Sequence, residues 1–147
     1  MNYTISSITS TEYPQLMDIW ERSVRATHDF LKEEDLLYYK EIIPNYFEAV
    51  QLAAVRNENN SILGFIGTSA ETIEMLFIDP HYRGKGIGKH LLYYALEKLK
   101  LTKVDVNEQN NQALVFYQSQ GFEVIDRSSL DDSGKAYPIL HLSHKLK

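Results

Sequence analysis

The stretch DPHYRGKGIGKHLL, residues 79–92, places three glycines among cationic side chains. It follows an apolar segment, residues 72–79, and precedes leucines at helical spacing, so it is expected to join a strand to a helix. The residues concerned are Arg83, Gly84, Lys85, Gly86, Ile87, Gly88 and Lys89. Backbone N–H groups at the start of a helix, with no Cβ atom in the way, form a site suited to a pyrophosphate group. The alternative is a tight turn whose basic residues bind no ligand.

Spacing argues against two other phosphate-binding loops. A dinucleotide-binding fingerprint requires G-x-G-x-x-G, whereas this run is G-x-G-x-G, one residue short before its last glycine. A P-loop requires four residues between its first glycine and a Gly-Lys pair, followed by Ser or Thr. Only three residues separate Gly84 from Gly88-Lys89, and His90 stands where the hydroxyl is needed. A domain that binds ATP or a nicotinamide cofactor is therefore disfavoured.

The composition limits the classes of partner. The chain has 147 residues and a formal net charge of −5. This length suits one domain over residues 1–147 with a single sizeable core. An acidic chain is a poor general nucleic-acid binder, because phosphate contacts require a basic face. We therefore expect no nucleic-acid partner, whereas cationic small molecules or peptide amines suit this charge as substrates.

The residue types exclude several kinds of chemistry. There is no cysteine, so disulfides, thiolate metal sites and a cysteine nucleophile are excluded. Most histidines lack ligand-like spacing with acidic residues, and no metal site is expected. Residues 1–13 lack the pattern of a signal peptide, and no apolar stretch approaches the roughly 18 residues of a membrane span. We expect a cytoplasmic protein without a membrane partner, and both a monomer and a homodimer stay open.

Hydrophobic periodicity predicts the order of elements. Helices are predicted over residues 10–28 and 29–47, the second broken or ended near Pro44. Strands follow over residues 49–56, 61–69 and 72–79, the first two joined by the turn signal NENN. After the glycines come a helix to about Lys100, a strand over 102–107, a helix over 110–120 stopped by Gly121, and strands over 122–127 and 136–146. This order predicts an α/β (α+β) fold with one mixed, mostly antiparallel sheet flanked by helices.

The glycine loop resembles motif A of the GCN5-related N-acetyltransferase (GNAT) family, whose members use acetyl-CoA. That motif is Arg or Gln, two residues, Gly, one residue, then Gly or Ala, and Arg83, Gly86 and Gly88 fit it. Residues 110–122, NNQALVFYQSQGF, match the second family motif, N-x-x-A-x-x-x-Y-x-x-x-G-F, at the usual distance downstream. The strings RSVRATHDFL, FIDP, VNEQN and DDSGKAYPIL are also similar to a bacterial subgroup, the YjaB-type acetyltransferases.

The resemblance implies an N-acetyltransferase with acetyl-CoA as co-substrate. It implies that the strand residues Leu76, Phe77 and Ile78 offer backbone groups to the pantetheine arm and the thioester carbonyl. The loop over residues 83–89 would cradle the pyrophosphate. Asn110 and Tyr117 would lie along the cofactor, with the Tyr117 hydroxyl near the sulfur as proton donor to the departing thiolate.

Acetyl transfer to an amine requires a neutral nitrogen, whereas a lysine-like amine has a reference pKa near 10.4, so a base is useful at neutral pH. Glu74, on the strand beside the thioester, is the favoured base, and strand alternation predicts that it shares a face with Leu76 and Ile78. Asp105 is the second candidate, and His28, where the first helix is expected to end, is the third. The structural alternatives are an exposed or ion-paired Glu74, a solvated Asp105, and a helix-capping or surface His28.

Because a covalent acetyl-thioenzyme is impossible without cysteine, direct attack of the amine on acetyl-CoA in a ternary complex is expected. The acceptor is predicted to be a primary amine of a small molecule or peptide, and acidic residues near the expected site favour a cationic one. The competing hypothesis is a non-catalytic acyl-CoA binding or sensing module on the same fold. The presence of both Glu74 and Tyr117 favours the enzyme.

Overall fold

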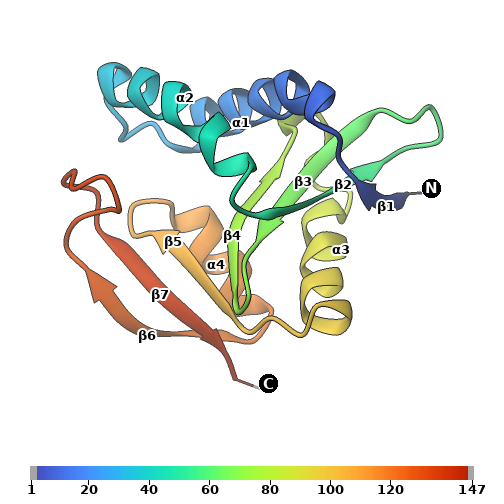
Figure 1. Ribbon diagram of the computed structural model, residues 1–147. Helices are drawn as coiled ribbons and strands as arrows, with labels where there is room; N and C mark the ends of the chain where they lie inside the picture. The colour runs from blue at the N-terminus through green and yellow to red at the C-terminus, as the bar shows by residue number, and fades with distance from the viewer. Residues whose placement is uncertain (1–2, 146–147) are drawn as a thin grey trace.

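The computed structural model describes residues 3–145, which form one seven-stranded mixed sheet with helices on both faces (Figure 1). The spatial order of the strands is β1-β2-β3-β4-β5-β7-β6. Within the described residues, the β4–β5 pairing is parallel and the others are antiparallel. The strands are β1 (Thr4–Ser7), β2 (Gln51–Arg56), β3 (Ile62–Thr68), β4 (Thr72–Ile78), β5 (Lys103–Asn107), β6 (Phe122–Ser128) and β7 (Ile139–His144), and the helices are α1 (Tyr13–Thr27), α2 (Glu33–Phe47), α3 (Ile87–Tyr93) and α4 (Asn111–Ser119). The predicted fold class is confirmed.

The sheet is split between β4 and β5. Thr72 is level with Lys103 and Ile73 with Val104, and the described residues form no further pair between these strands. The two strands then diverge like the arms of a V, with β1–β4 on one side and β5, β7 and β6 on the other (Figure 1). Beyond Ile73, the edge of β4 that faces β5 has no strand partner, so its backbone groups are available to a ligand.

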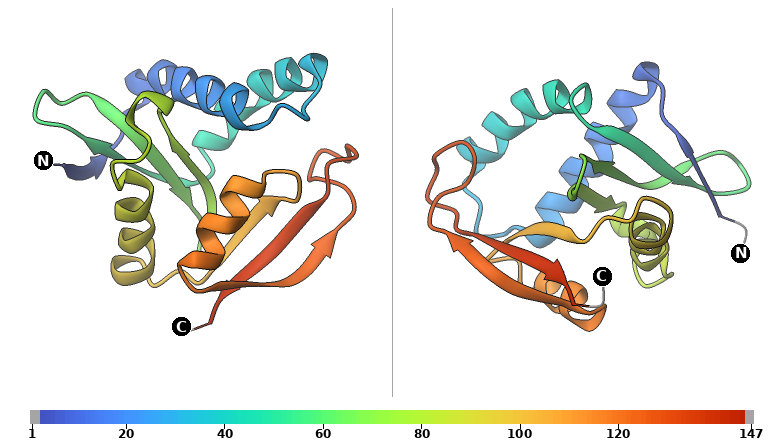
Figure 2. Two further views of the ribbon diagram at one scale, coloured as in Figure 1. Left: turned by 180° about the vertical axis from the view of Figure 1, so that it is seen from behind. Right: turned by 60° about the horizontal axis from the view of Figure 1, so that its bottom comes forward.

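Helices cover both faces of the sheet over separate apolar cores. Figure 2 shows α3 and α4 on one face and α1 and α2 on the other. The residues at the end of β4 contribute to both cores: Leu76 and Ile78 pack toward α3 and α4, and Met75 and Phe77 toward α1 and α2. No helix within the described part of the chain is long and apolar enough to cross a membrane.

Three local features differ from the sequence analysis. It predicts no strand at β1, whose four residues TISS carry little apolar alternation and pair with the edge of β2. Helix α2 continues through Pro44 to Phe47, because a proline this close to the end removes little of the hydrogen bonding and the buried Phe47 anchors the last turn. The helix after the glycines is α-helical only to Tyr93 and continues as a π-helical turn to Lys98.

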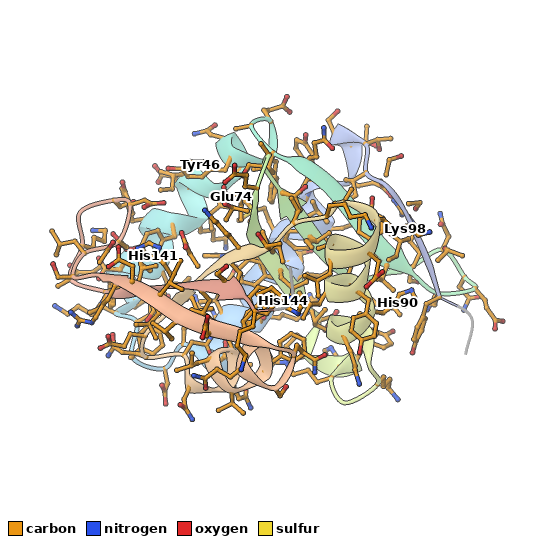
Figure 3. The ribbon with its side chains drawn as sticks, turned by 90° about the horizontal axis from the view of Figure 1, so that it is seen from below. Tyr46, Glu74, His90, Lys98, His141 and His144 are labelled. Atoms are coloured by element: carbon orange, nitrogen blue, oxygen red, sulfur yellow. The ribbon has the colours of Figure 1, made fainter. Side chains whose placement is uncertain are left out.

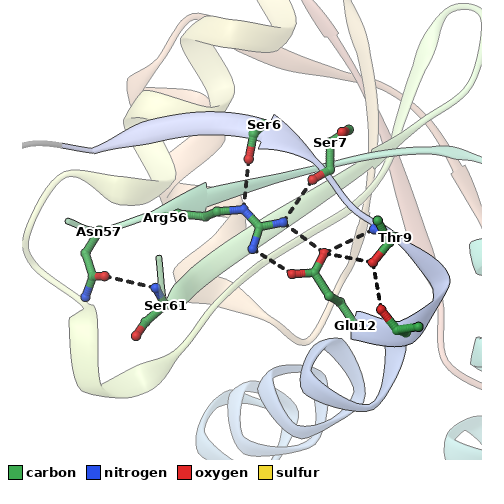
Figure 4. Close-up of polar contacts among 8 residues, drawn as sticks. Ser6, Ser7, Thr9, Glu12, Arg56, Asn57 and Ser61 are labelled. Atoms are coloured by element: carbon green, nitrogen blue, oxygen red, sulfur yellow. Dashed lines mark hydrogen bonds and ion pairs between the residues drawn. The ribbon is translucent and has the colours of Figure 1, made fainter. Parts of the chain in front are cut away.

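A buried arginine ties the N-terminal segment to the sheet (Figure 4). Arg56 on β2 is 7% exposed and donates two hydrogen bonds to Glu12, at 2.7 and 2.9 Å, and one to the Ser6 hydroxyl at 2.8 Å. Glu12 also accepts from the backbone N–H of Thr9 at 3.0 Å. The hydrogen bonds from Arg56, followed by that from Thr9, lower the pKa of Glu12 to about 2.

We expect Glu12→Gln to lower the free energy of unfolding at pH 7 by about 1–3 kcal/mol, because it weakens the charge-assisted bonds to a buried guanidinium. A carboxyl whose pKa is lower in the folded than in the unfolded chain stabilises the fold above its unfolded pKa, and this contribution disappears as the pH falls through the folded pKa. The difference in the free energy of unfolding between wild type and variant should therefore become smaller as the pH falls from 4.5 toward 2. Urea denaturation across this range measures it, and a difference that stays constant would contradict the assignment.

The loop between β6 and β7, residues 129–138, is bonded to α2. Tyr39 donates to Asp131, Tyr137 donates to Asp35, and the Lys135 ammonium lies 3.1 Å from Asp35. These contacts link the second half of the sheet to the helix layer that covers the first half.

Candidate active site

A pocket of about 500 Å³ lies beside the end of β4. Its walls come from the last turns of α1, the end of β4, the glycine loop and α4, so the two sequence motifs meet there. The residues predicted to bind the cofactor line it, except Lys85: Leu76, Phe77, Ile78, Arg83, Gly84, Gly86, Ile87, Gly88, Lys89, Asn110 and Tyr117. The volume is in the range of small-molecule and cofactor sites.

The conformation of the loop depends on two glycines with positive φ. Gly84 has φ 77° and Gly86 has φ 80°, a region that L side chains rarely adopt. Apart from the glycine itself and its neighbours along the chain, no heavy atom of the described residues lies within 4 Å of the place that a Cβ atom would take at either position. Gly86 also caps α3, whose first N–H groups have no partner inside the helix. The open backbone beside these N–H groups suits an anion such as a pyrophosphate.

A buried carboxylate ties the loop to α1. Asp79, directly after β4, accepts from Arg22 at 2.7 Å and from the backbone N–H of His81 at 3.1 Å. Burial by itself raises the pKa of Asp79, but the hydrogen bonds from Arg22 and His81 hold it below its usual value. Arg83 in turn donates to the Ser23 hydroxyl at 3.3 Å. Helix α1 therefore sets the position of the loop.

Two side chains of the second motif line the pocket from α4. Tyr117 is 6% exposed, and its ring centroid lies 5.2 Å from that of Phe116 and 5.5 Å from that of Phe122. Its hydroxyl has no hydrogen-bond partner among the described residues, and burial raises the pKa of Tyr117, so the phenol stays protonated and able to donate. Asn110 accepts from the backbone N–H of Ala113 at 3.2 Å and thereby also caps α4.

His28 forms part of the pocket wall where α1 ends. Its Nδ1 lies 2.7 Å from the Thr27 hydroxyl, and its ring packs 5.1 Å from that of Phe30. Burial, and then the positive charge of Arg83, lower the pKa of His28 to about 4. An imidazole with this pKa is neutral at physiological pH and a weak proton acceptor, which suits a pocket wall better than a base.

The depressed pKa of His28 predicts a stability change with pH. The folded state binds this proton less readily than the unfolded chain, so the stability contributed above pH 6.5 is lost as the pH falls toward 4. We expect His28→Gln to remove on the order of 2 kcal/mol of that loss. Thermal unfolding of both proteins between pH 7 and pH 4 measures it. If the stability of wild type and variant changed in parallel with pH, the pKa of His28 would be the same in the folded and the unfolded chain.

Glu74 lies outside the pocket lining, in a β-bulge where it has no partner on β3. The bulge interrupts the alternation along β4, so the predicted common face with Leu76 and Ile78 does not follow from strand geometry. The Glu74 carboxylate is exposed and accepts from the Ser69 hydroxyl at 2.8 Å.

Asp105 also lies outside the pocket lining, on β5, one residue beyond the last β4–β5 pair. Its Oδ1 is 2.7 Å from Nδ1 of His141 on β7. The other ring nitrogen of His141, Nε2, is 2.7 Å from the Ser128 hydroxyl on β6.

The sequence analysis misses six residues of the pocket wall: Ser23, Thr27, Tyr82, Gln112, Ala113 and Phe116. Several of them lie within or next to the two motifs, so the helical spacing of the second motif could have identified those on α4. The contacts of Asp79 with Arg22 and of Asp105 with His141 join residues 57 and 36 positions apart, which no local pattern reveals.

Comparison with known proteins agrees with this architecture. Residues 18–138 match the family model described as "Acetyltransferase (GNAT) domain". The chain is 41% identical over 133 residues to "Peptidyl-lysine N-acetyltransferase YjaB" of Escherichia coli (strain K12), with 90% of each chain covered. It is 29% identical over 128 residues to "Peptidyl-lysine N-acetyltransferase YiaC" of the same organism, which covers 84% of this chain and 85% of that one.

Solved structures share the fold. The solution structure of apo-form YjaB from Escherichia coli superposes with a TM-score of 0.92 at 39% identity, covering 99% of both chains. The PaiA N-acetyltransferase from Thermoplasma acidophilum in complex with coenzyme A superposes with a TM-score of 0.73 at 20% identity, covering 98% of this chain and 100% of that one. With a family match over most of its length and both sequence motifs gathered at one pocket, this chain belongs to the GNAT family of acetyl-CoA-dependent N-acetyltransferases.

Proposed function

We propose that this enzyme acetylates the ε-amino group of lysine side chains in peptides, by direct transfer from acetyl-CoA. The observation that carries the choice of acceptor is the 41% identity, over 90% of both chains, to a protein named as a peptidyl-lysine N-acetyltransferase. The acidic net charge is consistent with a cationic acceptor, because it attracts an ammonium group toward the site.

The pocket has features that suit coenzyme A at each end. The open backbone of residues 83–89 carries Arg83, Lys85 and Lys89 for the pyrophosphate, of which Arg83 and Lys89 line the pocket. The unpaired edge of β4 at Leu76, Phe77 and Ile78 offers backbone groups to the pantetheine amides and to the thioester oxygen. Asn110 and Tyr117 form the wall on the α4 side.

The proposed reaction joins the amine nitrogen to the acetyl carbon as the carbon–sulfur bond breaks. A backbone N–H near Leu76 or Phe77 stabilises the oxyanion. Tyr117, protonated in its buried position, donates a proton to the departing sulfur and regains one from the solvent. No acetyl-thioenzyme forms, since the chain has no cysteine to carry the acetyl group. Glu74 and Asp105 are the two candidates for the base, and we assign His28 to the pocket wall.

The choice of acceptor is tested with three matched peptides: one with a blocked N-terminus and a single lysine, the same peptide with arginine in place of lysine, and a lysine-free peptide with a free N-terminus. Acetylation measured by mass spectrometry is expected for the first peptide alone. A small polyamine provides a non-peptide comparison. Modification of the free N-terminus or of the polyamine in preference to lysine would contradict the proposed acceptor. Tight binding of acetyl-CoA without turnover of any amine would favour a non-catalytic module.

A further inference from the structure

Three polar side chains form a continuous hydrogen-bonded chain across the second half of the sheet. Asp105 on β5, His141 on β7 and Ser128 on β6 are joined by two contacts of 2.7 Å. An ionised carboxylate only accepts hydrogen bonds, so Nδ1 of His141 donates to Asp105, while Nε2 is hydrogen-bonded to the Ser128 hydroxyl. The two contacts therefore hold the orientation of the ring. We refer to these residues as the Asp105–His141–Ser128 chain.

The chain lies on the sheet face that α1 and α2 cover. Its strand neighbours Val104, Val106, Leu140 and Leu142 pack into the core under α3 and α4, so by alternation Asp105 and His141 point to the opposite face. The side chain of Asp105 is 47% exposed there, so its carboxylate is accessible to a ligand.

The Asp105 end of the chain lies at the start of the split. The first residues beyond the last β4–β5 pair are Glu74 on one strand and Asp105 on the other, so two carboxylates flank the point where the sheet opens. Glu74 and His141 are labelled in Figure 3, which shows the sheet from below. The other charged residues that strand geometry places on this face are Lys103 on β5 and, on β6, Asp126, which is level with His141, and Glu123, which is level with Ser143. Acidic groups at the split attract a cationic acceptor.

The reaction needs a proton acceptor at this place. The nitrogen of an ammonium group loses two protons as it becomes an amide. The sulfur of coenzyme A gains one proton, so the reaction releases one proton overall to the solvent. A base that takes a proton from the attacking nitrogen contributes typically about 10²–10⁴-fold to the rate when it is held in position. Of the two carboxylates at the split, Glu74 accepts from an exposed serine hydroxyl in a β-bulge, whereas Asp105 is oriented by the ring of His141.

We propose that Asp105 takes the proton from the attacking amine, and that His141 and Ser128 position its carboxylate. His141 occupies Oδ1 of Asp105 and leaves Oδ2 for the acceptor nitrogen, directly or through one water. As the nitrogen–carbon bond forms, the nitrogen–hydrogen bond breaks toward Oδ2, and the half-exposed carboxylate then releases this proton to the solvent. The inference rests on amine acetylation, the proposed function, but not on the identity of the amine.

Variants of His141 separate positioning from a merely structural contribution. Asparagine places an amide N–H where Nδ1–H lies, whereas leucine fills the space without a donor. We expect His141→Asn to keep kcat within about threefold of wild type, because a hydrogen bond to the Asp105 carboxylate is retained. We expect His141→Leu to lower kcat roughly tenfold or more with an unchanged KM for acetyl-CoA.

Substitution of the carboxylates completes the test. Asp105→Asn is expected to lower kcat roughly 10²-fold or more. Asp126→Asn, which removes the same charge from the same face without a bond to His141, is the matched control and should leave kcat unchanged. The series is run on the best acceptor of the wild-type enzyme, so wild-type turnover reports on the proposed function and the variants report on this inference. A greater loss in Glu74→Gln than in Asp105→Asn, or equal losses in Asp105→Asn and Asp126→Asn, would overturn it.

Discussion

Replacing Tyr117 with phenylalanine is expected to lower kcat by roughly 10²-fold or more, because the enzyme then has no buried acid to protonate the departing sulfur. Phenylalanine keeps the ring contacts with Phe116 and Phe122, which hold this part of α4 against the sheet. The free energy of unfolding and the affinity for coenzyme A should therefore stay close to those of wild type. Steady-state kinetics with saturating acetyl-CoA, together with calorimetric titration of coenzyme A, measures both quantities.

The control for Tyr117→Phe is Tyr46→Phe, which removes a hydroxyl from an exposed position on α2. It should change neither kcat nor binding. The burial of Tyr117 also predicts how the loss depends on pH: because the pKa of the phenol is raised, the wild-type donor stays protonated and the deficit of the variant should be uniform from pH 6 to pH 9. A variant that binds coenzyme A weakly but turns over normally once saturated would instead assign Tyr117 to binding alone.

Replacing Gly88 with valine is expected to weaken coenzyme A binding by roughly 100-fold or more, about 2.7 kcal/mol. A Cβ atom at this position would lie 3.7 Å from Cγ1 of Ile78 and 3.7 Å from Cζ of Phe116, which is ordinary contact distance. Both neighbours line the pocket, so the two methyl groups of valine extend into the space between β4 and α4. The Cβ atom itself meets no clash in the fold, and the loss should therefore appear mainly in binding.

Gly88→Ala gives the graded comparison. Alanine adds only the Cβ atom, so its effect on binding should be smaller than that of valine. Because Gly88 lies in the first turn of α3, alanine should also raise the stability of the ligand-free protein by up to about 1 kcal/mol. Thermal unfolding with and without coenzyme A separates the two effects. Equal ligand-induced shifts in wild type and Gly88→Val would mean that the pocket beside Gly88 is not the coenzyme site.

The sequence predicted well the parts of the site whose chemistry is local. The loop has positive φ at residues 84 and 86, and both positions are glycine in the sequence. The motif residues of α4 recur at helical spacing. These signals predict the strand end, the loop and Tyr117 as parts of one site, and the structure brings them together at one pocket. They also indicated the family, which the match over residues 18–138 confirms.

The features that escaped prediction depend on contacts between distant parts of the chain. The bulge at Glu74 arises because β4 has one more residue than β3 between two neighbouring pairs of the ladder. The sequence of either strand alone does not reveal this extra residue. Pro44 suggested a helix end, but the burial of Phe47 three residues later outweighs the local penalty. The environment of Asp105 depends on His141, which reaches it only because β7 is inserted beside β5.

That insertion has a consequence for how the chain folds during its synthesis. The strands of the first half-sheet, β1–β4, follow one another in space as in the chain, and they are complete once residue 78 has been made. The second half-sheet cannot close in the same way, because β7 lies between β5 and β6 although it is synthesised after both. Until residues 139–144 emerge from the ribosome, β5 and β6 each lack a neighbour, and their unpaired edges are exposed to non-native pairing. The half of the sheet that carries Asp105 is therefore the last to assemble, and a nascent chain stalled before β7 should be a better chaperone substrate than one stalled after β4.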